Sequence, residues 1–187
     1  GAAPASPLKL ASFLRDQAVS LAFLQTPQVL SLAREFPWAL ESVRALLWRG
    51  APEELERLRE TPAPEVLERM YHCYGSAEGG SGSAIQPLAA LPAQAPVVPV
   101  GPLAAGASLH LLGPRLELVP HGVTGEICLG GEGVARAYHL EPELTREAFV
   151  PDAVSEVDGA GLFRTGALGR RELYGSARLG AFAVDVR

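Results

Sequence analysis

Residues that could carry out chemistry are sparse in this chain. The glycine- and serine-rich run Gly79–Ser83 offers backbone N–H groups for a phosphate, but it lacks the lysine and the following helix of a P-loop. Ser76 lacks the Gly-x-Ser-x-Gly setting of a hydrolase nucleophile. No histidine has a carboxylate or cysteine partner at metal-ligand spacing; the four are His72, His110, His121 and His139. The residues alone predict a flexible loop at Gly79–Ser83, no catalytic residue and no metal site.

Composition excludes several classes of function. The chain has 187 residues, is 48% hydrophobic and carries a net charge of −5, which is typical of a globular protein with a real core. Lys9 is the only lysine and the arginines are scattered, so we expect neither nucleic acid nor an anionic membrane as partner. No apolar run approaches the roughly 20 residues of a membrane span, and Gly1–Pro7 does not resemble a signal peptide. We therefore expect a cytoplasmic protein in which Cys73 and Cys128 are buried thiols.

The first ~75 residues alternate between helical and strand-like patterns, which predicts a layered α/β unit. Ser6 and Pro7 form a cap and first-turn pair for a helix. Short apolar runs typical of buried strands follow at Val19–Leu24, Val43–Trp48 and Met70–Tyr74.

After Gly75 the pattern changes to short strands. A proline-rich stretch is followed by strand-sized runs at Leu109–Leu112, Leu116–Val119 and Glu126–Leu129, with one helical segment at Glu141–Phe149. We therefore predict an α/β subdomain over residues 1–86 and a β-rich, distorted barrel-like subdomain over residues 87–187.

Two adjacent segments resemble the adenylation domains of nonribosomal peptide synthetases, which belong to the adenylate-forming superfamily of acyl-CoA ligases and luciferases. The segments are Gly125–Tyr138 (GEICLGGEGVARAY) and Pro142–Val150 (PELTREAFV). In that family this stretch is a β-rich structural element without a catalytic acid or base. The resemblance therefore implies the fold of part of the family's large lobe, and it says little about activity.

A second resemblance covers His72–Glu78, which lies where the family carries its Tyr-Gly-Pro-Thr-Glu adenine-binding loop. It implies that Tyr74 stacks on adenine beside Gly75 and that Glu78 helps to hold Mg²⁺. Ala77 replaces the threonine whose hydroxyl would face the phosphate. We favour a structural interpretation here, in which Tyr74 ends a buried strand and Glu78 is a solvated loop acid.

The third resemblance is Phe163–Leu168 (FRTGAL), where the family has aspartate at the position of Ala167. That carboxylate holds both ribose hydroxyls of ATP through charge-assisted hydrogen bonds, which contribute on the order of 1.5 to 3 kcal/mol each. Its loss implies nucleotide binding weakened at least about tenfold. The next acid along the chain is Glu172.

The end of the chain resembles the family's hinge motif with its functional side chains replaced. Where the family has arginine, aspartate, glutamine and lysine, this sequence has Leu179, Ala181, Ala183 and Asp185. We also expect the chain to begin after the family's phosphate loop and to end before the mobile lobe with its catalytic lysine, whose charge stabilises the transition state of adenylation.

We therefore expect a partial adenylation domain without catalytic activity, which serves as a structural or interaction module in a peptide synthetase or hybrid polyketide assembly line. We expect no cofactor, although the family uses ATP and Mg²⁺. Candidate partners are neighbouring condensation, ketosynthase or carrier-protein domains and a small MbtH-like activator. An exposed apolar face of the α/β half would mark the docking surface. The alternatives are a fragment of an active amino-acid-adenylating enzyme and a module that binds a small molecule near Tyr74.

Overall fold

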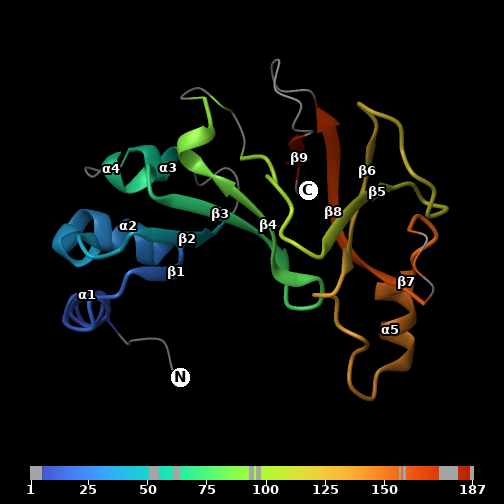
Figure 1. Cartoon of the computed structure of the whole chain (residues 1–187), viewed down its shortest axis with the longest axis horizontal. Helices are drawn as coiled ribbons and strands as arrows, with labels where there is room; N and C mark the ends of the chain where they lie inside the picture. The colour runs from blue at the N-terminus through green and yellow to red at the C-terminus, as the bar shows by residue number, and fades with distance from the viewer. Residues whose placement is uncertain are drawn as a thin grey trace. The chain divides into compact units, whose positions relative to one another are not determined.

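The structure is a computed structural model in which the chain forms two compact units (Figure 1). The first unit comprises the residues up to His72 together with Gln86–Val98, and the second comprises Cys73–Ile85 and the residues from Pro99 onward. With the predicted subdomains, residues 1–86 and 87–187, the chain would pass from one to the other only once. The chain passes between the two observed units three times. The two divisions are therefore not the same, and the predicted one stays a prediction. The described residues are 6–50, 55–60, 64–92, 95, 98–155, 157, 159–172 and 181–185.

Parallel strands and helices alternate in the first unit, as the sequence predicts. Ser6 caps the first helix by accepting a hydrogen bond from the Lys9 backbone at 3.4 Å, and Pro7 occupies its first turn. Strands β1, β2, β3 and β4 form one sheet in that order, and the pairs β1–β2 and β2–β3 are parallel. The elements are α1 (Pro7–Asp16), β1 (Leu21–Gln25), α2 (Thr26–Glu35), η1 (Pro37–Leu40), β2 (Ala45–Arg49), α3 (Leu55–Arg59), α4 (Pro64–Leu67), β3 (Met70–Ser76) and β4 (Gly80–Pro87).

Helices cover one face of this sheet, and on the other face the side chains of β1 are exposed while those of β2 and β3 are partly buried. Side chains of Leu24, Leu46 and Trp48 pack with buried residues of the helices in a single apolar cluster. On the opposite face Leu21 and Phe23 are 60% and 49% exposed. Parallel sheets are normally covered on both faces, whereas in the described part of this chain the side of β1 that carries Leu21 and Phe23 is exposed and apolar.

The second unit is built on an antiparallel sheet in the order β5-β6-β8-β7, with β9 also paired to β8. Over the described residues this sheet is open, so the expected barrel-like form is not a closed barrel. The chain thus has a mixed α/β fold with two sheets. The remaining elements are η3 (Leu88–Ala90), which lies in the first unit, and, in the second unit, β5 (Ala107–Leu112), β6 (Thr124–Gly131), α5 (Pro142–Ala148), β7 (Phe149–Pro151), β8 (Gly161–Glu172) and β9 (Ala181–Asp185).

Two local predictions are wrong. The run Gly79–Ser83 was expected to be a flexible loop, but β4 begins at Gly80 and pairs with β3. Leu116–Val119 was expected to be a strand, and it forms only an isolated bridge between Leu118 and Leu112. The pairing of β4 with β3 overrides the local composition of the first run. The second run follows a turn in which the Gly113 N–H donates to the Glu117 carbonyl oxygen at 2.8 Å. Among the described residues, the structure has no helix that is long and apolar enough to cross a membrane.

His72 is buried in the first unit, where it is 4% exposed. Its ring lies 4.8 Å from that of Trp48, and its Nε2 is 3.2 Å from the carbonyl oxygen of Gly50. Burial lowers the pKa of His72 below its ordinary value, against the opposing effect of the Gly50 carbonyl. The folded protein therefore excludes a proton that the unfolded chain accepts below about pH 6.5.

We predict from this that the free energy of unfolding falls as the pH drops below about 6.5, with a slope of up to about 1.4 kcal/mol per pH unit. Urea unfolding at pH 7.5 and pH 5.5 measures the effect. The His72→Phe variant keeps a ring against Trp48 and has a shallower slope; the slope that remains includes His110, whose pKa burial also lowers. Identical slopes in the two proteins would contradict the prediction.

Candidate functional site

The segment that resembles a nucleotide-binding motif forms a bulge in β8. Glu126 of β6 pairs with Leu168 and Cys128 pairs with Arg164, so Ile127 alone stands opposite the three residues Thr165–Ala167. Gly166 within the bulge has a φ of 73°, and a Cβ added there would meet nothing within 4 Å. The backbone conformation, and not a lack of space, therefore requires glycine at this position.

The hydroxyl of Thr165 fixes the bulge from one side. It donates a hydrogen bond to the carbonyl oxygen of Ile127 at 2.8 Å and accepts one from the backbone N–H of Ala167 at 3.1 Å. The same side chain hydrogen-bonds with Tyr74 of β3. One hydroxyl thus joins three segments that are far apart in the sequence.

The carboxylate of Glu126 holds the bulge as well. It accepts hydrogen bonds from Arg164 at 2.9 and 2.6 Å and from the backbone N–H of Gly166 at 3.1 Å. This pairing raises the pKa of the Arg164 guanidinium above its ordinary value. Sequence reasoning missed Glu126, because only the register of β6 against β8 brings an acid from 40 residues away to this motif.

Ala167 packs at the edge of an apolar cluster in the second unit, together with Tyr74 and Val119; the buried members are Ala84, Val100, Leu109, Leu111, Ile127 and Leu129. Side chains alternate along a strand, so Glu126 and Ile127 point to opposite faces of β6. Because Ala167 packs with the cluster that contains Ile127, the Ala167 side chain and the Glu126 carboxylate lie on opposite faces.

Tyr74 lies half-buried within β3, two residues before the strand ends, and contacts the same apolar cluster. Burial raises the pKa of its hydroxyl, and the hydrogen bond with Thr165 opposes that rise. The neighbouring Gly75 has a φ of 148°, and a Cβ there would lie 1.9 Å from the carbonyl oxygen of Gly80. The structure therefore brings Tyr74 and the Thr165–Ala167 bulge together, and glycine at 75 permits the close approach of β3 and β4.

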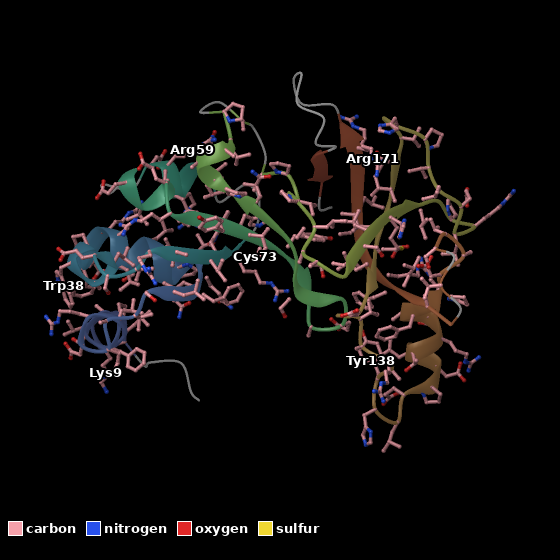
Figure 2. All side chains as sticks on the ribbon, viewed as in Figure 1. Lys9, Trp38, Arg59, Cys73, Tyr138 and Arg171 are labelled. Atoms are coloured by element: carbon pink, nitrogen blue, oxygen red, sulfur yellow. The ribbon has the colours of Figure 1, made fainter. Side chains whose placement is uncertain are left out.

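Glu78 is half-buried and is not the solvated acid that we expected. Its carboxylate accepts a hydrogen bond from the hydroxyl of Tyr138 at 3.0 Å, and its backbone carbonyl accepts one from Ala135 at 2.7 Å. Tyr138, labelled in Figure 2, stacks edge-on with Phe149 at 5.4 Å. In the sequence, Tyr138 belongs only to the segment that resembles a structural motif. No local signal pairs Tyr138 with Glu78, which lies 60 residues away.

The structure also places the cysteines and several of the histidines. Across the described ranges, no group of three or more His, Cys, Asp or Glu side chains is arranged to hold a metal ion. Both cysteines are buried, as predicted, and burial raises the pKa of Cys128 to about 11. His110, His121 and Arg171 line a pocket of about 110 Å³ with Leu109, Leu111, Leu118 and Val119.

The hinge-like segment is described only in part. Ala181, Ala183 and Asp185 lie on β9, where they pair with Glu172, Arg170 and Leu168 of β8. Leu179 falls outside the described residues. The structure therefore places this segment beside the strand that carries the bulge.

Comparison with known proteins identifies relatives for this arrangement. Residues 3–139 match the family described as AMP-binding enzyme. The chain is similar to tyrocidine synthase 3 of Brevibacillus parabrevis, with 31% identity over 165 residues that cover 87% of this chain and 2% of that protein. It is also similar to bacitracin synthase 3 of Bacillus licheniformis, with 33% identity over 162 residues that cover 83% of this chain and 2% of that protein.

Among solved structures, the fold is similar to that of PA1221, an NRPS protein containing adenylation and PCP domains. The TM-score is 0.77 at 21% identity, and the match covers 99% of this chain and 36% of that one. The chain thus spans about a third of the length of that solved protein, and 2% of the length of the two synthases.

The network around Thr165 leads to a prediction about stability. Thr165→Val keeps the shape of the side chain but removes the hydroxyl that Ile127, Ala167 and Tyr74 share. We expect the free energy of unfolding to fall by about 2 kcal/mol, because polar partners are left without a hydrogen bond. Urea unfolding measures the loss. Thr165→Ser keeps the hydroxyl and serves as the matched control, and a valine variant as stable as the serine variant would refute the role of the hydroxyl.

Proposed function

The chain belongs to the AMP-binding enzyme family, and from this premise we propose that it is a catalytically inactive part of an adenylation domain that acts as a structural and interaction module in a peptide synthetase. The observation that carries the proposal is the bulge at Thr165–Ala167. Its backbone geometry and its supporting contacts with Glu126 and Tyr74 are present, while the side chain at 167 is a methyl group packed against an apolar cluster.

The chemistry of the bulge supports a loss of nucleotide binding. By the family resemblance, an aspartate at position 167 would hold the ribose, and each charge-assisted hydrogen bond contributes about 1.5 to 3 kcal/mol. A methyl group supplies neither bond. Glu78, the position that by resemblance approaches Mg²⁺, is hydrogen-bonded to Tyr138.

The alternative is that the chain is a fragment of an active adenylating enzyme. Residues replaced within the segments that resemble the family disfavour this alternative. Missing segments can be supplied by the rest of a longer chain. Ala167 and Ala181, however, lie within segments that the chain retains, so a flanking sequence would not restore their side chains.

An interaction role is supported by the uncovered face of the first sheet. Leu21 and Phe23 are exposed there, and the register places Phe23 beside Leu47, which pairs in turn with Tyr71. We propose that neighbouring synthetase polypeptide covers this face, with a condensation, ketosynthase or carrier-protein domain as the candidate. A small MbtH-like protein is a further candidate partner, and we place the assembly in the cytoplasm.

The first test of this proposal is enzymatic. We predict that the protein shows no amino-acid-dependent ATP–pyrophosphate exchange and no thermal shift with ATP and Mg²⁺, because the ribose has no acid to bind. The Ala167→Asp variant introduces the acid, and Ala167→Asn is the uncharged control of similar size. The difference between the two variants in thermal shift with ATP and Mg²⁺ measures how much of the loss of nucleotide binding is due to position 167. Exchange or a saturable thermal shift in the unmodified protein would overturn the proposed inactivity.

The second test concerns the uncovered sheet face. We expect Phe23→Ser to lower the fluorescence of the hydrophobic dye ANS, while the unfolding temperature changes little because Phe23 is half exposed. Phe13→Ser is the matched control, since Phe13 is 57% exposed on α1 and not on the sheet. Equal dye binding by the Phe23 variant and the unmodified protein would contradict the assignment of this face.

A further inference from the structure

Leu140 combines two unfavourable features. Its side chain is 84% exposed, more than that of any other large hydrophobic residue described, and its φ is 57°. The left-handed region disfavours residues with a β-carbon, and exposure of a leucine recovers none of that free energy. Glycine or asparagine would avoid both disadvantages.

Nothing in the neighbouring helix accounts for a leucine at this position. Leu140 precedes Glu141, the N-cap of α5. An apolar residue at that position often packs on the fourth helical residue, but that residue is Thr145. The Thr145 hydroxyl is engaged instead with the backbone of Tyr138 and Glu141. Leu144 is also exposed, at 47%, and the described side chains of α5 include none that is buried.

The segment that carries these leucines is firmly held at its base. The Tyr138 backbone N–H donates to the Thr145 hydroxyl at 3.0 Å, and the Tyr138 hydroxyl donates to Glu78 at 3.0 Å. The Tyr138 ring packs against Phe149, which packs against Phe163 of β8. Figure 1 shows α5 and the loop before it beyond the ends of the strands of the second sheet. The exposed leucines are thus presented on a preorganised support, which lowers the cost of binding.

Charge around the leucines indicates the chemistry of a partner. Glu141, Glu143 and Glu147 are all exposed, and Arg146 pairs with Glu143. The segment from His139 to Ala148 therefore carries two net negative charges when histidine is neutral. A matching surface would combine an apolar socket with lysine or arginine side chains at its rim.

We propose that Leu140 and Leu144 form the docking site for a partner protein that presents an apolar socket with a basic rim. The two leucines supply the apolar contact, and the exposed glutamates around them attract lysine or arginine side chains of the partner. This docking site is independent of the uncovered sheet face and of the proposed loss of catalysis.

An NMR titration of the full chain tests the proposal. The probe is a short amphipathic helical peptide of leucine and lysine, and its twin with glutamate in place of lysine is the charge control. We expect the basic peptide to shift the amide signals of residues 138–148 in a saturable way and the acidic twin to have little effect. Failure of the basic peptide to shift these signals, or equal shifts with both peptides, would overturn the proposal.

Leu140→Asn separates a docking role from a structural one. We expect at least a tenfold loss of affinity for the basic peptide together with a rise in unfolding temperature of roughly 2 to 4 °C, because asparagine tolerates the left-handed conformation. Leu8→Asn, at a 54% exposed leucine of α1, is the matched control and keeps the affinity. Unchanged affinity or a lower unfolding temperature in the Leu140 variant would show that Leu140 does not act as a docking residue.

Discussion

The bulge in β8 is held by two side chains, the hydroxyl of Thr165 and the carboxylate of Glu126, and the arrangement of the candidate site depends on them. Thr165 ties the bulge to β6 and to Tyr74, while Glu126 binds both Arg164 and the backbone of Gly166. These contacts stabilise the bulge, in which three residues of β8 stand opposite Ile127 and interrupt the regular register of the strand. The bulge in turn sets the position of Ala167 against the apolar cluster.

These contacts separate the part of the site that maintains the fold from the part that would bind a ligand. Gly75 and Gly166 have the backbone conformations that the close packing and the bulge require. Ala77 and Ala167 stand where the family resemblance implies a hydroxyl and a carboxylate. A protein that no longer binds nucleotide loses nothing by such replacements, whereas replacement of the glycines would strain the sheet. The proposed scaffold role rests on this combination of two constrained glycines and two alanines.

Much of the fold follows from local patterns, but the contacts within the site do not. Periodic apolar runs and the Ser6 cap are sufficient to predict the first three strands and the first helix. The glycine-rich run that becomes β4 looks like a loop because its pairing with β3 is not encoded in its own composition. The family resemblance identified Tyr74 and Ala167 as candidate site residues. It gave no indication of Glu126 or Tyr138 as supporting residues, because each acts through a register or a hydrogen bond between segments 40 or 60 residues apart.

The central claim is that the segment around the bulge does not bind nucleotide, and an NMR titration with ATP and Mg²⁺ that follows the amide signals of Tyr74, Thr165 and Ala167 tests it most directly. The account predicts no saturable shift of these three signals at millimolar nucleotide, because position 167 carries a methyl group where, by the family resemblance, an acid would bind the ribose. Saturable shifts confined to these residues would show that this segment binds nucleotide, and they would contradict the account.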